Sequence, residues 1–209
     1  MAFVAVVDYG MGNLDSVRRA LEVVGATVVV TSDPDDLAEA DRIVLPGVGA
    51  FGIAMENLRA RGLDGALREQ VVDQGAPFLG ICLGMQLMAS RSTEHGDHEG
   101  LGWVGGTVDR LLPTAADPRV PHVGWNEVHP TVAHPVFAGV EPDRDVYFVH
   151  SYAIACDDPA TSLATTPYCG GFTSVIGTGS AVGMQFHPEK SQQVGQQLLK
   201  NWLAWDGRP

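Results

Sequence analysis

Residues 77–86 read PFLGICLGMQ, and this short stretch decides how the rest of the chain is interpreted. Residues 77–81 form an apolar run, which is typical of a strand buried on both faces of a parallel sheet. The residues from 83 to about 90 predict a helix. Cys82 stands between the two elements, with a glycine two residues away on each side. This order of elements is the pattern of a nucleophile elbow, with cysteine in place of serine.

The elbow pattern has direct consequences for the Cys82 thiol. A tight turn holds the nucleophile in a strained backbone conformation, and Gly80 and Gly84 allow strand and helix to approach closely. A helix N-terminus favours the thiolate, and the N–H of Leu83 would face an oxyanion formed beside Cys82. A lone cysteine is more often a buried structural residue. The coincidence of strand, glycines and helix instead favours a catalytic thiol.

The residues before this stretch predict an α/β fold. Buried strands are expected at 3–7, 28–30 and 43–45, and apolar residues at helical spacing predict helices at 14–24 and 58–71. Strands without polar alternation that are joined by helices indicate a mostly parallel sheet covered on both faces. We therefore expect a three-layer α/β sandwich.

The second half of the chain has a different texture. Residues 92–102 are polar and glycine-rich, which predicts a surface loop, and short apolar runs between 103 and 186 predict added antiparallel strands. Ser191 is expected to cap a final helix. The apolar side of that helix consists of Val194, Leu198, Leu199, Trp202 and Leu203.

Length and composition limit the class of protein. The 209 residues, 45% of them hydrophobic, suffice for one substantial core, so a single domain at 1–209 is expected. The net charge of −12 and the scattered Lys and Arg disfavour nucleic acid or an anionic membrane as a partner. The three cysteines form no Cys-x-x-Cys pair, which fits a reducing cytoplasm. The apolar N-terminal run is short and reaches Asp8 at once, so a buried strand is expected rather than a signal peptide.

A catalytic thiolate needs a base and a group that orients the base. His187 follows a predicted strand and precedes the last helix, in the run FHPE at 186–189. The carboxyl ends of parallel strands are where open α/β sheets place their sites, so His187 is expected beside Cys82. Glu189 is near enough in sequence to hold the second imidazole nitrogen.

The other histidines and cysteines compete poorly with this pair. His95 and His98 share an acidic loop but have no further ligand cluster, so neither a metal nor a cofactor is expected. The remaining histidines are interpreted as structural (His122 and His150) or solvated (His129 and His134). Cys156 and Cys169 are interpreted as ordinary small hydrophobic residues.

Residues 47–52 read GVGAFG, which matches the dinucleotide-binding pattern. That reading requires an acidic residue at the end of the next strand, but the next strand ends at Cys82. The better interpretation is a loop whose N–H groups, at Val48 and Gly49, face the same pocket as Cys82.

The motifs taken together point to a family. GICLGMQ at 80–86 with FHPE at 186–189 resembles the class I (triad) glutamine amidotransferases. Five further motifs resemble one branch, the glutaminase subunits of imidazole glycerol phosphate synthases in histidine biosynthesis. They are DYGMGN at 8–13, LPGVGAF at 45–51, PHVGWN at 121–126, YFVHSY at 147–152 and HPEKS at 187–191.

The resemblance implies a role for each matching residue. Cys82 would attack the side-chain amide of L-glutamine, His187 would relay protons, and Glu189 would orient His187. Gln86 and Glu94 would bind glutamine, while Leu83, Val48 and Gly49 would supply the oxyanion environment. A separate (β/α)8-barrel cyclase would take the ammonia in a heterodimer. The interface positions implied are Asn13, Trp125 and Lys190, although Trp125 also fits a plain core residue and Lys190 a solvated helix start.

Two alternatives remain at this stage. A glutaminase of another synthase, such as pyridoxal phosphate synthase, or a γ-glutamyl hydrolase would share the triad but not the motifs at 124–126 and 147–152. A non-catalytic flavodoxin-like module would keep the fold without the chemistry, against which the complete triad argues.

Overall fold

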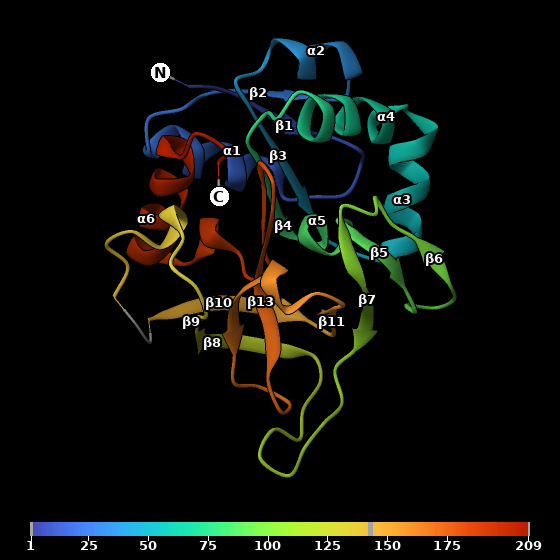
Figure 1. Cartoon of the computed structure of the whole chain (residues 1–209), viewed down its shortest axis with the longest axis vertical. Coiled ribbons are helices and arrows are strands. Elements are labelled where there is room, and N and C mark those ends of the chain that lie inside the picture. The colour runs from blue at the N-terminus through green and yellow to red at the C-terminus, as the bar shows by residue number, and fades with distance from the viewer. Residues whose placement is uncertain (1, 142–143, 209) are drawn as a thin grey trace.

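A computed structural model describes residues 2–141 and 144–208, and it places a central sheet between two layers of helices (Figure 1). The sheet has eight strands in the order β2-β1-β3-β4-β14-β13-β12-β9. The first five are mutually parallel, and β13, β12 and β9 continue the sheet antiparallel. Their bounds are Phe3–Val7 (β1), Thr27–Thr31 (β2), Arg42–Gly47 (β3), Phe78–Cys82 (β4), His129–Pro130 (β9), Ser162–Thr166 (β12), Phe172–Thr178 (β13) and Ala181–Met184 (β14).

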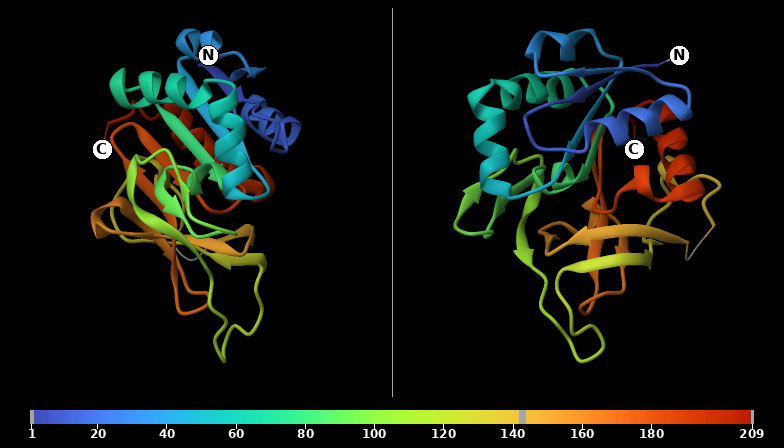
Figure 2. Two further views of the ribbon diagram at one scale, coloured as in Figure 1. Left: turned by 90° about the vertical axis from the view of Figure 1, so that its right-hand side faces the viewer. Right: turned by 180° about the vertical axis from the view of Figure 1, so that it is seen from behind.

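The alternation of side chains along each strand builds two cores, one on each face of the sheet. Val4 and Val6 of β1 join the core beneath α1 and α6, whereas Ala5 and Val7 join the core beneath α3 and α4. Figure 2 shows these helix pairs on opposite sides of the sheet. The predicted α/β three-layer sandwich with a mostly parallel sheet is therefore confirmed.

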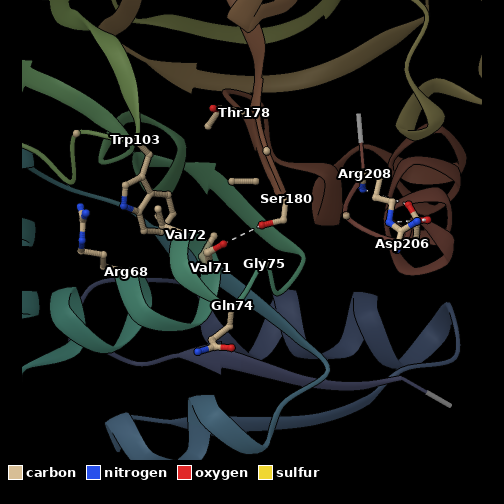
Figure 3. Close-up of a pocket in the computed structure, with 14 residues that line it drawn as sticks. Arg68, Val71, Val72, Gln74, Gly75, Trp103, Thr178, Ser180, Asp206 and Arg208 are labelled. Carbon is tan, nitrogen blue, oxygen red and sulfur yellow. Dashed lines mark hydrogen bonds and ion pairs between the residues drawn. The ribbon is translucent and has the colours of Figure 1, made fainter.

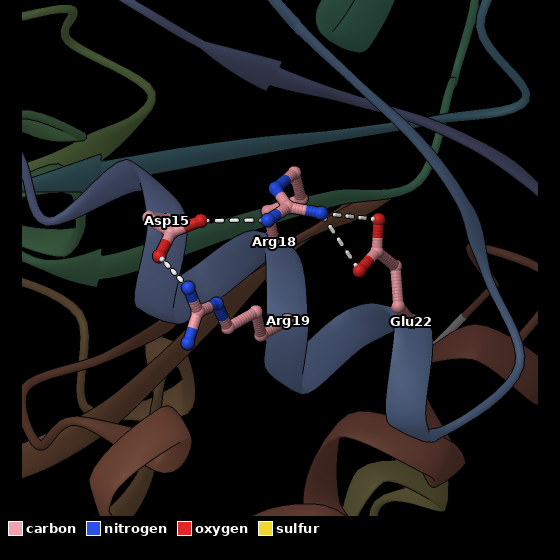
Figure 4. Close-up of polar contacts among 4 residues, drawn as sticks. All are labelled: Asp15, Arg18, Arg19 and Glu22. Carbon is pink, nitrogen blue, oxygen red and sulfur yellow. Dashed lines mark hydrogen bonds and ion pairs between the residues drawn. The ribbon is translucent and has the colours of Figure 1, made fainter.

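Helix α1 (Leu14–Val23) buries Val17 and Leu21 and presents charged residues on its outer side. Arg18 bridges Asp15 and Glu22, and Arg19 pairs with Asp15 (Figure 4). These pairs are exposed, so water and salt screen them and each contributes little to helix stability. The charged side of α1 therefore faces solvent, and the packing of Val17 and Leu21 fixes the position of the helix.

The prediction of one continuous helix at 58–71 is wrong, because these residues belong to three successive helical segments. The structure has α3 (Phe51–Ala60), α4 (Leu63–Leu67) and a π-helical segment (Arg68–Asp73) in its place. Gly62 separates α3 from α4 with a φ of +67°, a left-handed conformation that glycine adopts without strain. The sequence analysis also missed α2 (Pro34–Glu39), which begins with a proline and is capped by the Asp33 side chain.

The polar loop predicted at 92–102 is also partly structured. The chain forms β5 (Ala89–Ser92) and pairs it with β6 (His98–Glu99). These two strands join a second sheet in the order β11-β7-β5-β6. Its other strands are β7 (Val104–Arg110) and β11 (Tyr152–Cys156).

The predicted strands between 103 and 186 are present, and two of them form a separate ribbon. β8 (His122–Glu127) and β10 (Asp145–His150) pair only with each other, antiparallel. The last helix, α6 (Gln192–Ala204), packs Leu198, Leu199 and Trp202 into the core as expected.

Ser191 is the N-cap residue of α6 as predicted, but its side chain makes no capping hydrogen bond to the helix. Its hydroxyl donates to His187 O (2.6 Å) and accepts from Tyr147 N (3.0 Å), so Ser191 ties the segment after β14 to β10. Among the described residues, no helix is long and apolar enough to cross a bilayer.

The close approach of Gly84 to β3 gives a stability prediction. A Cβ at position 84 would lie 1.8 Å from Leu45 O, whereas a Cβ at Gly65 in α4 would meet nothing within 4 Å. Gly84→Ala should therefore destabilise the fold by about 3 kcal/mol or more. Gly65→Ala should stabilise it by about 0.5–1 kcal/mol, because alanine favours a helix. Urea unfolding of both variants measures the difference, and equal stabilities would contradict this close packing of α5 on β3.

Candidate active site

Cys82 ends β4 and directly precedes α5 (Leu83–Gln86). Its backbone has φ 53° and ψ −107°, a conformation that a non-glycine residue adopts only under strain. The side chain is 6% exposed, so the thiol faces a narrow opening. The strand, strained residue and helix occur in the order that the elbow pattern predicts.

The two flanking glycines are needed because backbone packs against backbone here. A Cβ on Gly80 would lie 2.7 Å from Gly84 O, and one on Gly84 would collide with Leu45 O. Distances below 3.0 Å require the surrounding backbone to shift. Glycine at both positions therefore lets α5 lie directly on β4 and β3, which fixes the direction of the Cys82 side chain.

The helix expected at 83–90 is much shorter than predicted. α5 ends at Gln86, and Ala89 already belongs to β5. The aligned dipoles of a long helix stabilise an anion at its N-terminus, and a single turn supplies only part of that effect.

His187 lies on the segment between β14 and a 3-10 turn at Pro188–Lys190, and its backbone N–H donates to Tyr147 O (2.9 Å). Its Nδ1 donates to Glu189 Oε1 at 2.8 Å, and both side chains are almost fully buried. Because a carboxylate only accepts, Nδ1 carries the proton and Nε2 faces the other way. Nε2 is buried without a hydrogen bond of normal geometry to any described residue.

The charges around His187 favour its protonated form. Burial alone would lower the pKa of His187, but interactions with the Cys82 sulfur and with the Glu189 carboxylate outweigh burial and raise it to about 9. Burial raises the pKa of Tyr9 above its usual value, and the charge of Cys82 raises it further. Cys82, His187 and Tyr9 thus form one electrostatically coupled group, with Glu189 behind His187.

A pocket of about 410 Å³ opens over the thiol. Val48, Gly49, Leu83, Gln86 and Glu94, all predicted from sequence, line it with Cys82. The loop at 47–49 thus faces the Cys82 thiol, and Gly49 adopts a φ of +113°. Sequence analysis missed six further lining residues: His95, Arg110, Val149, His150, Ser151 and Tyr152.

The model of the family described as glutamine amidotransferase class-I matches residues 5–205, which is nearly the whole chain. The chain belongs to the class I glutamine amidotransferases. The resemblance that the sequence motifs indicated is therefore confirmed at the level of the family.

Relatives of this amidotransferase share almost half of its residues. It is 48% identical to imidazole glycerol phosphate synthase subunit HisH of Rhodospirillum rubrum, over 97% of this chain and 98% of that protein. It is 50% identical to the protein of the same name from Symbiobacterium thermophilum, over 97% and 93% of the two chains.

Solved structures of lower identity share the fold of this amidotransferase. One, titled as a glutamine amidotransferase, has a TM-score of 0.74 at 18% identity and covers 96% of this chain and 97% of its own. A glutamine amidotransferase from Thermotoga maritima has a TM-score of 0.69 at 19% identity, covering 97% and 96%. At these identities the likeness concerns the fold alone.

Two of the three predicted interface residues lie together on the outside of the β8–β10 ribbon. Trp125 is 47% exposed, so the alternative that it is a core residue is wrong. Its ring meets the edge of Tyr147, whose ring centroid lies 5.8 Å from Lys190 Nζ. Asn13 is exposed before α1, on a different element.

A buried hydrogen-bond chain runs behind the pocket, and the acceptor-only carbonyl of Tyr152 gives it a direction. His150 Nδ1 donates to Tyr152 O (2.9 Å), so His150 Nε2 must accept from His122 Nδ1 (3.1 Å). His122 Nε2 then accepts from Asn126 Nδ2 (3.2 Å). Burial lowers the pKa of His150 to about 3 and that of His122 to about 4, so both rings stay neutral. Both histidines are structural in this sense, as the sequence indicated.

Other sequence features lie outside the site. His129 is exposed, but His134 is half-buried and accepts from Val136 N, so its predicted solvation is wrong. Cys156 and Cys169 are free thiols away from the pocket over Cys82. The described part of the chain contains no group of three metal-ligating side chains.

A larger cavity of about 720 Å³ lies at the opposite ends of the parallel strands (Figure 3). Arg68, Trp103, Ser180 and Arg208 contribute to its walls. Cys82 does not line it, and the lining residues that adjoin β4 and β14 in the chain come before these strands, not after them. Open α/β sheets bind ligands beyond the carboxyl ends of their strands, so the smaller pocket is the candidate active site.

The neutral His150 gives a pH prediction. Its folded pKa lies below the unfolded value near 6.5, so its contribution to stability is present above 6.5 and is lost as the pH falls toward 3. Between about pH 7.5 and about pH 5.5 this group should cost the wild type about 1.4 kcal/mol. The stability difference between wild type and His150→Leu should shrink by that amount.

Urea unfolding at the two pH values measures this difference. His122 and His187 are the titratable groups whose charges act on His150, and both are retained in the variant. His129→Leu, at an exposed position, serves as the control. A stability difference that is the same at both pH values would contradict the buried, neutral state of His150.

Proposed function

We propose that this chain is the glutaminase subunit of imidazole glycerol phosphate synthase, which supplies ammonia from L-glutamine to a cyclase subunit in histidine biosynthesis. The observation that carries the proposal is the buried Glu189–His187 pair, which interacts with the strained Cys82 at the floor of one pocket. Subunits HisH of imidazole glycerol phosphate synthase, 44–50% identical to this chain over nearly its full length, favour that branch of the family.

The first chemical half is attack of the Cys82 thiolate on the side-chain amide carbon of glutamine. The amide oxygen becomes an oxyanion, for which Leu83 N–H and the Val48-Gly49 loop are the neighbouring backbone donors. His187, with its pKa near 9, is charged at neutral pH and can give its Nε2 proton to the departing nitrogen. Ammonia leaves, and a γ-glutamyl thioester on Cys82 remains.

The second half returns the enzyme to its starting state. Neutral His187 now accepts a proton from water, which attacks the thioester carbon and regenerates an oxyanion in the same position. Collapse releases glutamate and restores the thiolate and the imidazolium. Glu189 keeps its hydrogen bond to Nδ1 throughout, so Nε2 is the only nitrogen that exchanges protons.

Charges at the pocket rim match the amino-acid end of glutamine. Glu94 and the exposed Arg110 both line the pocket, so an ammonium and a carboxylate each find a group of opposite charge. Glu94 Oε2 accepts from Phe51 N (2.7 Å), which holds this carboxylate at the start of α3. Gln86 donates both N–H groups within the protein, so only its Oε1 is left to accept a hydrogen bond from the substrate.

The outside of the β8–β10 ribbon is the proposed docking face for the cyclase. Val123, Trp125 and Val149 are exposed there; Val123 lies across from Val149, and Trp125 lies across from Tyr147. Contiguous exposed apolar side chains mark protein interfaces. Val149 also lines the active-site pocket, so this face continues into the site. Ammonia is nucleophilic only when unprotonated, and a covered route would keep it from becoming ammonium in solvent.

Two further statements belong to this proposal. We place the reaction in the cytoplasm, because three free thiols and a biosynthetic activity suit a reducing compartment. We also treat residues 1–209 as one domain, since strands from both halves of the chain share the eight-stranded sheet. The glutaminase of pyridoxal phosphate synthase remains the competing assignment, and recovery of that synthase as the partner would favour it.

Removing the nucleophile tests the chemistry. Cys82→Ala, co-expressed with the cognate cyclase, should lose glutaminase activity by at least about a thousandfold, because no thioester can form. Cys169→Ala, which changes a thiol outside the pocket, should keep full activity. Glutamate release in the presence and absence of the cyclase's ligand is the measurement. Activity that survives in Cys82→Ala would overturn the proposed mechanism.

Removing the exposed indole tests the docking face. Trp125→Ala should weaken binding to the cyclase about tenfold or more, since buried tryptophans are frequent hot spots at interfaces. Leu112→Ala removes a side chain that is 75% exposed after β7 and should leave the affinity unchanged. Titration calorimetry with the purified cyclase compares the two. Equal effects of both substitutions would place the interface elsewhere.

A further inference from the structure

Gln185 lies between β14 and His187 and is completely buried. Its side-chain amide does not line the pocket, and the reaction steps above make no use of it. Gln185 Nε2 nevertheless lies 3.7 Å from the Cys82 sulfur, within hydrogen-bonding distance for a sulfur acceptor. A buried amide in contact with the nucleophile needs an explanation, because burying polar groups costs free energy unless they are paired.

The orientation of this amide follows from the hydrogen bonds on its other side. Gln86 Nε2 donates to Tyr152 O at 2.8 Å and to Gln185 Oε1 at 3.0 Å. A carbonyl oxygen can only accept, so the nitrogen of Gln86 must face Tyr152 and the oxygen of Gln185 must face Gln86. The NH₂ group of Gln185 is thereby turned toward Cys82.

We propose that Gln185 is a positioning residue that donates an N–H to the Cys82 thiolate and holds the sulfur in its deprotonated form. A donor to a charged acceptor stabilises the charged form, and it does so more strongly in a buried site than in water. Because α5 is only one turn long, a hydrogen bond from Gln185 can add to the stabilisation that the helix N-terminus gives the thiolate. The inference rests on the proposed role of Cys82 as the nucleophile.

The neighbouring charges define what else acts on the sulfur. Tyr9, after β1, and His187, after β14, are the titratable groups whose charges couple to Cys82. Glu189 and His150 couple to His187, which lies beside the sulfur. All four remain in variants of Gln185, so a change in the thiol's titration would report the amide alone.

The test is the pH dependence of alkylation at Cys82 by iodoacetamide, followed on the Cys82 peptide by mass spectrometry. Gln185→Met keeps the length of the side chain and removes the donor, and it should move the inflection upward by about one pH unit. Gln185→Glu keeps the shape but turns an oxygen toward the sulfur, and it should move the inflection at least as far. If Gln185 only fills space, Gln185→Met, which introduces no charge, should titrate like the wild type.

Matched controls separate this effect from loss of packing. Gln197→Met removes an amide on α6 that bonds Asn201, and it should leave the inflection of Cys82 unchanged. Cys169 in the same samples should react alike in all variants, since unfolding would change its rate too. Gln86→Met does not touch the sulfur but removes the group that orients Gln185, so it should also raise the inflection. Unchanged inflections in Gln185→Met and Gln86→Met would overturn the inference.

A separate glutaminase assay on the complex with the cyclase distinguishes this inference from the proposed function. Wild-type protein that shows the expected alkylation pattern and hydrolyses no glutamine would refute the function and leave the role of Gln185 standing. Wild-type protein that hydrolyses glutamine while Gln185→Met titrates unchanged would refute the role of Gln185 alone.

Discussion

The structure depends on one close contact, the backbone of Gly84 against the carbonyl of Leu45. This contact lets α5 lie directly on β3 and β4, and it forces Cys82 into a left-handed conformation at the junction. The strain of that residue, of order 1–3 kcal/mol, is held by packing on both faces of the sheet. A looser approach would relax the turn and let the thiol rotate away from His187. Burial of the sheet and the position of the Cys82 thiol at the pocket are therefore two results of the same packing.

The chemistry-bearing residues could be predicted from sequence because they follow buried strands. Cys82 ends β4 and His187 comes shortly after the neighbouring β14, so strand order alone brings them together. Glu189 is then within reach because a proline-started turn brings it back toward the imidazole. The glycines at 80 and 84 indicated the elbow, since their lack of a side chain is visible in the sequence itself. The sheet type followed from the alternation of strands and helices over residues 3–71, and the family from motifs spread over the chain.

What the sequence did not predict rests mainly on backbone groups and on long-range contacts. The shortness of α5 is set by β5 pairing with β7, which no local pattern around residue 87 reports. The Ser191 hydroxyl bonds Tyr147 across 44 residues and makes no capping hydrogen bond to its own helix. Arg110 and Tyr152 reach the pocket because β7 and β11 form a second sheet beside it. Gln185 looked like one more polar residue in a strand, since the two side chains that it bonds, Gln86 and Cys82, lie about a hundred residues earlier in the chain.

The carbonyl of Tyr152 has a consequence for how this site can vary through evolution. It directs one arm of hydrogen bonds through Gln86 to the nucleophile and another through His150 to Asn126. A point mutation at position 152 exchanges the side chain and leaves the carbonyl where β11 holds it. Most single mutations therefore leave the Tyr152 carbonyl in place, whereas a mutation of Gln86 or His150 removes a side chain that donates to it. We therefore expect position 152 to vary more freely through evolution than positions 86 and 150.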